Sequence, residues 1–534
     1  MKKLALALMA CGMALAATAQ DAFDVLHLST TQLRGTSRYM SMAGSFGALG
    51  GDISVLNQNP GGIGVYRSSD LSITLSLDLN SAESVGSEKI SHTKFNVNNI
   101  GYVGAMKVNS DVLKNFNWGF SYNRNNSFHR HYRGGIGNIE TSLSNYIAAQ
   151  LNAEGYTPAD LESSTGFNPY FDGYAPWIGI VSYGLKPTKG TTKPNIVNQN
   201  GSQMQGLYGD GTYGIAEYEI DERGYTDEFS IAFGGNFVNT VYWGATVGII
   251  DMDYKSYAYY GESLEKAYVL DGTKFDNSMW ASYGYENVNR TRGNGYNFKL
   301  GVIVKPVNEF RFGLAFHTPT FFKLHDDYYV VGAMEAGKGD VTTMAGTKGS
   351  NDGYSHRVYY KIKTPWRFIG SVAGVIGKQA MVNLDYEYVG NQTMRVGEEN
   401  GPDYSDVTAR VKEYFQPSHI VRLGAEFRIN PSWSLRAGYS YKTTQVKDDM
   451  DKARMDVVTV SNNPAYQYDN SEQHITAGLG YRYKAFYADL AYVHQYRKSV
   501  YNAFSPIVSA GEPNLAADIK DHNNRISLTL GYRF

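Results

Sequence analysis

Apolar and polar residues alternate along much of this chain, and the alternation is clearest at its end. Ile526, Leu528, Leu530, Tyr532 and Phe534 are apolar, whereas the residues between them are polar or glycine. Successive side chains of a β-strand point to opposite faces of a sheet, so a period of two predicts strands with one apolar face. The same period recurs over residues 310–316, 382–388, 421–429 and 433–441. We therefore expect an all-β protein.

Fourteen segments carry this strand pattern, and most of them have the length that a tilted strand needs to cross a bilayer, about 9–12 residues. They begin near Leu71, Asn96, Asn117, Glu228, Val241, Tyr296, Glu309, Trp366, Gln379, His419, Trp433, His474, Ala485 and Arg525. Beyond the first 19 residues the chain has no apolar run long enough for a transmembrane helix.

The connections between these strands differ in length in a regular way. From the fourth strand onward, short turns near residues 239–240, 307–308, 377–378, 430–431 and 484 alternate with long connections such as residues 257–295. A soluble sandwich has no reason to sort its loops by length, whereas outer-membrane barrels have short periplasmic turns and long external loops. Residues 67–534 are therefore expected to form a transmembrane antiparallel β-barrel of about 14 strands in a Gram-negative outer membrane.

Tyrosines lie near the ends of the expected strands, where outer-membrane barrels carry aromatic girdles. These tyrosines are Tyr102, Tyr242, Tyr254, Tyr388, Tyr441, Tyr483 and Tyr492. Phe534 closes the last alternating strand and resembles the carboxy-terminal signal that the barrel assembly machinery reads. We expect that machinery and the lipid of the outer membrane to be partners of the chain.

Residues 1–19 have the features of a secretory signal peptide. Two lysines precede an apolar run over residues 4–15, and Ala17-Thr18-Ala19 fits a small-x-small cleavage site. The single cysteine, Cys11, lies in this segment, so the processed chain can form no disulfide. A formal net charge of −2 provides no broad basic field, and no nucleic-acid partner is expected.

Residues 20–66 precede the first expected strand and are rich in glycine. A barrel of about 14 strands encloses a wider lumen than the eight-stranded barrels that side chains alone can fill, so this lumen needs a plug. Glycines allow a backbone to approach its surroundings closely in a confined space. We expect residues 20–66 to form a hatch inside the lumen, with Gly44, Gly47, Gly61 and Gly62 among its gating residues.

Residues 126–227 connect two expected strands and are too many for a bare loop. Residues 143–155 within this segment have the apolar spacing of a helix. We expect a large, partly folded extracellular insertion.

The expected hatch and several strands resemble a known family. Gly35-Thr36-Ser37-Arg38, then SMAGSFGALGGD from Ser41 and NQNPGGIG from Asn57 are similar to the amino-terminal signature of the long-chain fatty acid transporter (FadL/TodX) family of outer-membrane proteins. Later segments are similar too, namely FRFGLAFHTPTFF from Phe310, TPWRF from Thr364, VNLDYEYV from Val382, VRLGAEFRINPSWSLRAGYSYKT from Val421 and TAGLGYRY from Thr476. The resemblance covers nearly the whole chain after the signal peptide.

This resemblance implies a fourteen-stranded barrel with an amino-terminal hatch. It also implies passive, ligand-gated uptake of hydrophobic molecules such as long-chain fatty acids, which leave sideways into the membrane. The hatch of the family carries an Asn-Pro-Ala element, for which this chain has Asn59, Pro60 and Gly61. The side exit of the family depends on a kink in an early strand, and residues 115–119 are the candidate here.

Several charged residues fall on the expected lumen face of the strands. They are Arg311, Asp385, Glu387, Arg422, Glu426, Arg428 and Arg436. Isolated charges are costly in a poorly solvated interior, so we expect these residues to pair with one another and with the hatch. A carboxylate ligand could use one of the arginines, which makes Arg311 and Arg422 candidate ligand-binding residues.

His129 and His131 would share one face of a strand and are further candidate ligand-binding residues. They leave open a second function, a haem receptor on the same barrel, and a surface-exposed adhesive or structural barrel is a third. The chain has no G-x-S-x-G, H-E-x-x-H or Walker motif, so no enzyme is expected. No cofactor and no metal site are expected either.

Overall fold

The computed structural model of the 534-residue chain describes residues 21–84, 86–153, 198–200, 203–271, 274–336, 340–344, 356–377, 379–459, 463–508, 511 and 513–534. The expected signal peptide lies outside these ranges. Helices in the described residues are short, namely α2 (Ala22–Leu28), α3 (Ser37–Ser41), α4 (Val55–Gln58), the 3-10 helices η1 (Pro60–Val65) and η3 (Asn391–Thr393), α5 (Leu143–Ala153), α8 (Ser405–Tyr414) and α9 (Asp448–Asp451). Within the described ranges, no helix is long and apolar enough to cross a membrane.

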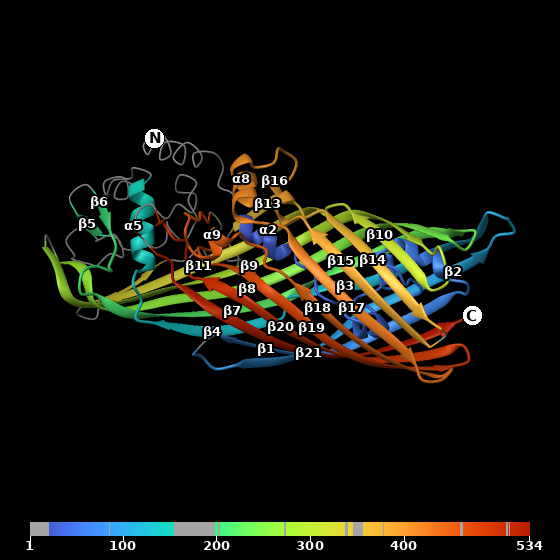
Figure 1. The fold of residues 1–534 in the computed structure, drawn as a ribbon. Helices are drawn as coiled ribbons and strands as arrows, with labels where there is room; N and C mark the ends of the chain where they lie inside the picture. The colour runs from blue at the N-terminus through green and yellow to red at the C-terminus, as the bar shows by residue number, and fades with distance from the viewer. Residues whose placement is uncertain are drawn as a thin grey trace.

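Long antiparallel strands make up most of the described chain (Figure 1). They are β1 (Asp70–Ser84), β2 (Ile90–Lys107), β3 (Leu113–Ser127), β4 (Arg130–Gly137), β7 (Tyr213–Phe237), β8 (Val241–Asp271), β9 (Lys274–Val304), β10 (Phe310–His317), β11 (Phe321–Ala336), β12 (Asp340–Met344), β13 (His356–Lys363), β14 (Arg367–Ile376), β15 (Ala380–Val389), β16 (Arg395–Glu398), β17 (Ser418–Arg428), β18 (Trp433–Lys442), β19 (Tyr466–Tyr483), β20 (Phe486–Asn502) and β21 (Ala516–Arg533). A separate small hairpin is formed by β5 (Asn198–Asn200) and β6 (Gln203–Gln205).

The strands form a closed ring. β1 pairs with both β2 and β21, so the first and last strands of the barrel are neighbours. Some strands are broken into consecutive pieces, since β4 continues β3, β11 continues β10, β14 continues β12 and β13, and β16 continues β15. Counted in this way, the described residues form a closed barrel of 14 antiparallel strands. The expected fold class is confirmed, and each of the expected strands is present.

The expectation that residues 257–295 form a loop is wrong, because β8 and β9 are each 31 residues long. The outward face of β8 is apolar as far as Ile249 and then becomes polar at Asp251, Asp253 and Lys255. Apolar alternation therefore ends where the wall leaves the lipid, whereas the strand continues with water on its outer side. In Figure 1, β7, β8 and β9 run past the other strands toward α5.

Two prolines explain the breaks within neighbouring strands. Pro319 separates β10 from β11, and Pro365 separates β13 from β14, because proline has no N–H to donate to a neighbouring strand. The two breaks lie side by side. The backbone N–H of Thr320 donates to the Thr364 hydroxyl at 2.8 Å, and the Thr364 N–H donates to the Thr320 carbonyl at 3.1 Å.

The outer wall exposes a belt of large apolar side chains, as a membrane-spanning barrel requires. The belt includes Leu71, Phe120, Ile231, Leu300, Leu314, Leu384, Leu423, Leu490 and Leu528. Of the tyrosines expected in the girdles, Tyr441, Tyr483 and Tyr492 are exposed. Tyr242 and Tyr254 are buried instead, which corrects their assignment to a girdle. Tyr254 lies on the lumen face of β8, where its hydroxyl donates to Glu222 at 2.9 Å.

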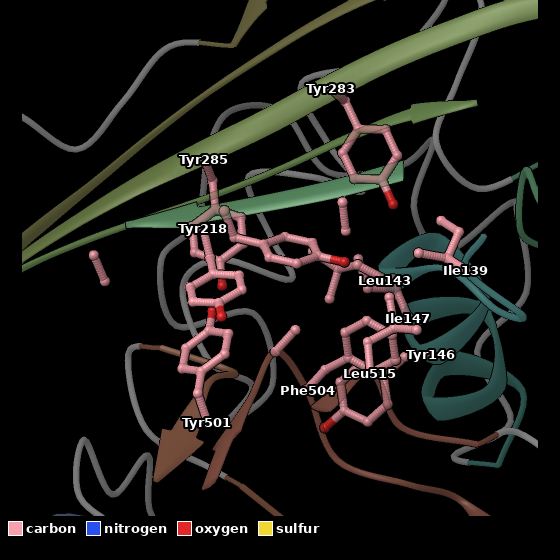
Figure 2. Packing of buried hydrophobic residues seen from close by; sticks show 14 of the residues in the cluster. Ile139, Leu143, Tyr146, Ile147, Tyr218, Tyr283, Tyr285, Tyr501, Phe504 and Leu515 are labelled. Atoms are coloured by element: carbon pink, nitrogen blue, oxygen red, sulfur yellow. The ribbon is translucent and has the colours of Figure 1, made fainter. Parts of the chain in front are cut away.

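At the end of the barrel opposite the short turns, a cluster of buried aromatic residues contacts α5 (Figure 2). The rings of Tyr218 and Tyr501 stack with centroids 4.3 Å apart, and those of Tyr146 and Phe504 stack at 5.6 Å. Helix α5 matches the helical spacing in residues 143–155, and both ends of the 126–227 segment are strand, in β3, β4 and β7. Residues 154–197 and 201–202 of that segment lie outside the described ranges, and its external position stays a prediction.

Candidate functional site

Residues 21–66, called here the N-terminal segment, form hydrogen bonds to strands around the whole ring. Its backbone N–H groups at Ser37, Ala43 and Phe46 donate to Thr529, Thr476 and Asp385 at 2.7–3.1 Å. Its carbonyl groups accept from side chains of the strands, namely Leu49 from Arg311, Leu56 from Thr246, and Tyr66 from Asn115. The segment is therefore fixed to the wall on all sides by directional bonds.

Glycines of the wall allow this close approach. A Cβ added to any of them would meet an atom of the N-terminal segment at less than van der Waals distance, and they are Gly101, Gly119, Gly234, Gly244, Gly301, Gly313, Gly424, Gly438 and Gly478. Gly234, Gly244 and Gly301 are paired across β7, β8 and β9, where they form a flat seat for η1. Close contact between the segment and the wall thus depends on glycines of the strands as well as on those of the segment. Sequence reasoning missed these strand glycines.

Asn59 holds η1 to the wall. Its side-chain oxygen accepts the N–H of Gly61 at 3.0 Å, and its amide donates to the carbonyls of Gly47 at 2.5 Å and Val302 at 3.3 Å. Pro60 begins the 3-10 helix, where its missing N–H costs nothing. A Cβ on Gly61 would lie 2.9 Å from the backbone of Val302, so the position has no room for a larger residue.

The other three glycines expected to take part in gating, Gly44, Gly47 and Gly62, have distinct surroundings. Gly44 has a φ of +74°, a left-handed conformation that favours glycine. Gly47 donates its N–H to Asp385 at 3.1 Å and contacts Ser371 of β14. Gly62 packs on Val55 and Gly50 within the segment. Their part in gating stays a prediction.

Two buried ion networks tie the segment to the strands. Arg34 contacts Asp78 of β1 at 2.5 Å, and Asp78 also accepts from Arg525 of β21 at 2.8 Å. Nearer the short turns, Arg38 contacts Glu426 at 2.9 Å, and Arg436 bridges Glu426 and Asp489 at 2.6 Å each. Of the lumen charges expected to pair, Glu426 and Arg436 contact each other, and Glu426 also contacts Arg38 of the segment.

A cavity of about 190 Å³ lies between residues 26–34 and the wall. One part of its lining is apolar and includes Leu26, Leu28, Ile250 and Phe322. The other part is charged and consists mainly of ion pairs, namely Lys299 with Glu228, and Arg367 and Arg422 with Glu387. His474 and Glu472 contact each other at 3.3 Å in the same part of the lining. The cavity thus offers an apolar surface beside a set of buried cations and anions.

Arg422 and Arg311, the two candidate arginines, have different positions. Arg422 lines this cavity, where its Nη2 contacts Glu387 at 2.5 Å and its Nη1 has no partner among the described residues. Arg311 does not line the cavity and donates to the Leu49 carbonyl at 2.8 Å. A buried guanidinium N–H without a partner leaves room for one further acceptor at Arg422.

A smaller cavity of about 90 Å³ lies against α2. Asp21 caps the helix by accepting the N–H groups of Phe23 and Asp24 at 2.7 and 3.0 Å. Burial raises the pKa of Asp21 to about 6, although these two N–H groups oppose the shift. Burial also raises the pKa of Asp24, to which the charge of Asp21 contributes. His27 at the other end of α2 lies 3.0 Å from Glu222.

The wall next to the larger cavity has an incomplete seam between β2 and β3. Their pairing runs from Lys107↔Asn115 to Asn99↔Asn123, so residues 90–98 of β2 have no partner in β3 among the described residues. Both edges bulge at this point, since the register skips Asn98 in the β1–β2 pairing and Asn125 in the β3–β7 pairing. Bulges end strand pairing in this way. We call this opening the β2–β3 seam.

Residues 115–119, where a kink is expected, pair regularly with β2 and with β7. The register of β3 against β7 shifts at two places, at Lys114 directly before this stretch and at Asn125 beyond it. Two asparagine-rich stretches, NVNN from Asn96 and NRNN from Asn123, face each other at the seam. Asparagine is a poor strand former, so this repeated motif in two neighbouring strands is the signal that sequence reasoning missed.

The N-terminal segment fills the β2–β3 seam. The backbone N–H of Gln32 donates to the Asn125 carbonyl at 2.9 Å, and its side-chain amide donates to the Ser127 carbonyl at 3.2 Å. On the other edge, Arg34 donates to the Asn98 side chain at 2.8 Å. Gln32, Arg34 and Asn125 also line the 190 Å³ cavity, so the cavity ends at the seam.

A third cavity of about 440 Å³ lies below the segment, at the end with the short turns. Its lining is rich in charged side chains, including Arg38, Asp52, Asp70, Glu426, Arg428, Arg436, Arg482, Asp489 and Arg533. A path straight through the barrel would therefore cross this second chamber, lined by many charged side chains, after the 190 Å³ cavity.

The two candidate histidines are not brought together as a pair on one strand. His129 lies between β3 and β4, and its carbonyl accepts from Asn80 at 3.0 Å. His131 lies in β4, and its Nε2 contacts Glu219 at 2.8 Å. In the described part of the chain, no cluster of three or more histidine, cysteine, aspartate or glutamate side chains could hold a metal ion.

Comparison with solved structures finds similar barrels of low sequence identity. A FadL homologue from Pseudomonas aeruginosa matches with a TM-score of 0.51 and 12% identity, over 95% of this chain and 99% of its own. The toluene transporter TodX of Pseudomonas putida matches with a TM-score of 0.47 and 10% identity, over 94% and 99% of the two chains. The toluene transporter TbuX of Ralstonia pickettii matches with a TM-score of 0.44 and 12% identity, over 94% of this chain and 99% of its own. The match to the Pseudomonas aeruginosa homologue supports the barrel fold.

Comparison with curated proteins finds no match. A family model, by contrast, matches residues 225–534, more than half of the chain. Its description is outer membrane protein transport protein (OMPP1/FadL/TodX), a family of transport proteins rather than enzymes. The closed barrel, its apolar outer belt and this match agree, and the chain belongs to the FadL/TodX family of outer-membrane transport proteins for hydrophobic compounds.

Proposed function

We propose that this protein takes up hydrophobic small molecules, long-chain fatty acids among them, by passive diffusion that the ligand itself gates. The ligand binds in the 190 Å³ cavity and leaves through the β2–β3 seam into the membrane. The observation that carries the proposal is that this cavity ends at a stretch of the wall where β2 and β3 are not paired among the described residues, and where Gln32 and Arg34 of the N-terminal segment bond to the two edges. Two contacts of the wall also cross this stretch, from Arg124 to Asn96 and between His92 and the His129 carbonyl.

The polar chamber below the segment favours the sideways route. An alkyl chain that continued toward the short turns would have to enter the 440 Å³ chamber, which is lined by ion pairs such as Arg436 with Asp489 and Arg533 with Asp70. Water held by such charges is a poor solvent for an alkyl chain. The seam leads from the cavity to lipid instead, so the alkyl chain does not cross this chamber.

Arg422 supports a carboxylate as the head group of the ligand. Its Nη1 is buried and unpartnered among the described residues, and it lies on the charged side of the cavity. A charge-assisted hydrogen bond from a guanidinium to a carboxylate is about twice as strong as a neutral one. The alkyl tail would pack on Leu26, Leu28 and Phe322 on the apolar side.

Opening of the seam requires five hydrogen bonds to break. Gln32 makes two to β3, Thr30 accepts one from Asn126, Thr31 accepts one from Arg367, and Arg124 donates one to Asn96 across the seam. At about 1 kcal/mol for each exchange of a protein partner for water, this amounts to about 5 kcal/mol. A ligand that displaces residues 30–32 from the cavity can supply such an energy by burying part of an alkyl chain, while the ion pair of Arg34 with Asp78 keeps the segment on β1.

A disulfide across the seam tests the proposal. The chain has one cysteine, Cys11 in the expected signal peptide, so Gln32→Cys with Asn125→Cys would introduce one pair on adjacent backbones. Oleate uptake into proteoliposomes should stop on oxidation and return on reduction. Ser37→Cys with Ser527→Cys is the matched control, because it joins the same segment to β21 away from the seam. Full uptake by the oxidised Gln32–Asn125 variant would contradict the proposal.

A further inference from the structure

The outer wall carries a group of exposed and half-exposed cations above the apolar belt. The group lies on β9, β11, β13 and β16 and consists of Arg292, Lys323, Arg357, Lys361, Lys363 and Arg395, which we call the cationic wall patch. None of these residues contributes to the cavities or to the β2–β3 seam. The transport proposal therefore leaves this surface without a role.

Strand register places the patch at the boundary of the lipid. Phe321 pairs with Tyr296 and with Lys363, and the Tyr296 and Phe321 rings stack with centroids 5.4 Å apart at the top of the belt. Lys363 in turn pairs with Arg395 at the same height. The next outward-facing pair, Lys323 with Lys361, lies two residues further along, or about 7 Å. These cations therefore lie where lipid head groups begin.

The carboxylates within the patch leave it with an excess of positive charge. Asp327 is shared by Arg292 at 2.8 Å and Arg357 at 2.5 Å, and Asp403 is shared by Lys361 at 3.3 Å and Lys363 at 3.0 Å. One carboxylate can neutralise only one of two cations, so each group of three carries a net charge of one.

Lys323 adds to this excess. Its side chain is 62% exposed, and its nearest carboxylate, Glu399, is 4.0 Å away. The Arg395 guanidinium donates to a backbone carbonyl, that of Met394, at 2.7 Å. Among the described residues, the ion pairs of these six cations thus involve three carboxylates, Asp327, Asp403 and Glu399.

We propose that the cationic wall patch binds the phosphate groups of an anionic glycolipid in the outer leaflet of the membrane. Cations next to a membrane-spanning surface attract anionic head groups, with about 1 kcal/mol for each lysine or arginine. Two shared carboxylates hold the cations at fixed spacing, so several can bind phosphate oxygens of one head group at once. The acyl chains of the same lipid would lie against Phe321 and Tyr296 below.

Binding of diphosphoryl lipid A to the detergent-purified protein, followed by native mass spectrometry, tests this proposal. The variant is Lys323→Gln, Lys363→Gln and Arg395→Gln, which removes three cations and keeps side chains of similar length. The matched control is Lys498→Gln with Lys520→Gln, two exposed lysines paired with each other on the far side of the barrel. At about fivefold for each cation, the apparent Kd of the triple variant should rise by one to two orders of magnitude.

The control variant should bind like the wild type, and the wild-type complex should dissociate as salt is raised from 0.05 to 0.5 M, because exposed charges are screened. This salt series uses the unmodified protein, so it stands even if the triple variant folds poorly. Equal Kd values for the triple variant and the wild type, binding that is insensitive to salt, or equal binding of dephosphorylated lipid A would each overturn the proposal.

Discussion

The glycine seat under η1 leads to a sharp prediction about how tightly the N-terminal segment is held. Gly244→Ala would add a Cβ directly against the backbone carbonyl of Pro60. Unlike a side chain, that carbonyl cannot rotate away, because η1 is fixed by Asn59 on one side and by Val302 on the other. Overpacking of a tight interior costs about 1–3 kcal/mol. At about 2 kcal/mol, the population in which the segment has left its seat would rise by about 30-fold.

Gly370→Ala is the matched control, because a Cβ at Gly370 of β14 would meet nothing within 4 Å. Both changes reduce the freedom of the unfolded chain equally, so the difference between them isolates the contact with η1. Hydrogen exchange of the amides in residues 55–65 should be about 30-fold faster in Gly244→Ala than in Gly370→Ala. The ion conductance of planar bilayers should also be higher with Gly244→Ala than with Gly370→Ala. Equal exchange rates in the two variants would refute the reasoning, because they would mean that the segment is not seated on these glycines.

Three further changes test other contacts. Glu426→Gln removes the carboxylate between Arg38 and Arg436. Breaking a buried ion pair typically lowers the free energy of unfolding by about 3–5 kcal/mol, and because Arg436 keeps Asp489 we expect a value near the lower end of this range. The measurement is the unfolding temperature, which should fall. Arg422→Gln should weaken oleate binding by about tenfold and leave binding of an alkane unchanged; an equal loss for both ligands would argue against a carboxylate at this arginine. The raised pKa values of Asp21 and Asp24 mean that the docked helix α2 binds protons more tightly than the free chain, so docking should weaken as pH rises above about 4. The double change Asp21→Asn and Asp24→Asn should remove this dependence in limited proteolysis, and a wild type whose cleavage does not change with pH would contradict it.

The positions of the strands could be predicted from the sequence, but their ends could not. Alternation of apolar and polar residues reports contact with lipid, and on β8 that contact ends near Ile249 although the strand runs to Asp271. Beyond this point the alternation inverts, because the inward residues, such as Ile250 and Met252, are apolar and buried while the outward residues are polar. A search for strands that have an apolar lipid face therefore stops too early. The same limit misassigned Tyr254, which has the spacing of a girdle residue and yet lies on the lumen face.

The candidate site was predictable in its residue types more than in its geometry. The lumen charges were found because they interrupt the apolar pattern, and most of them are paired. Whether an arginine lies in the cavity, as Arg422 does, or against the N-terminal segment, as Arg311 does, depends on register and on where the segment lies. The contact of Gln32 with Asn125 joins residues far apart in the chain, and no local pattern encodes it.

The last strand, β21, holds both the first strand of the barrel and the N-terminal segment. It completes the ring by pairing with β1, and it also holds the N-terminal segment through Ser37 on Ser527 and Thr529 and through Arg525 on the Leu33 carbonyl. During synthesis the N-terminal segment is made first and β21 last, so the contacts of the segment with β21 can form only when the ring is nearly complete. A barrel that closed with the segment outside would leave Thr529 and Arg525 facing an empty lumen. Correct insertion of the amino-terminal residues is therefore part of the final ring-closing step, and errors in either should appear together as misassembled protein.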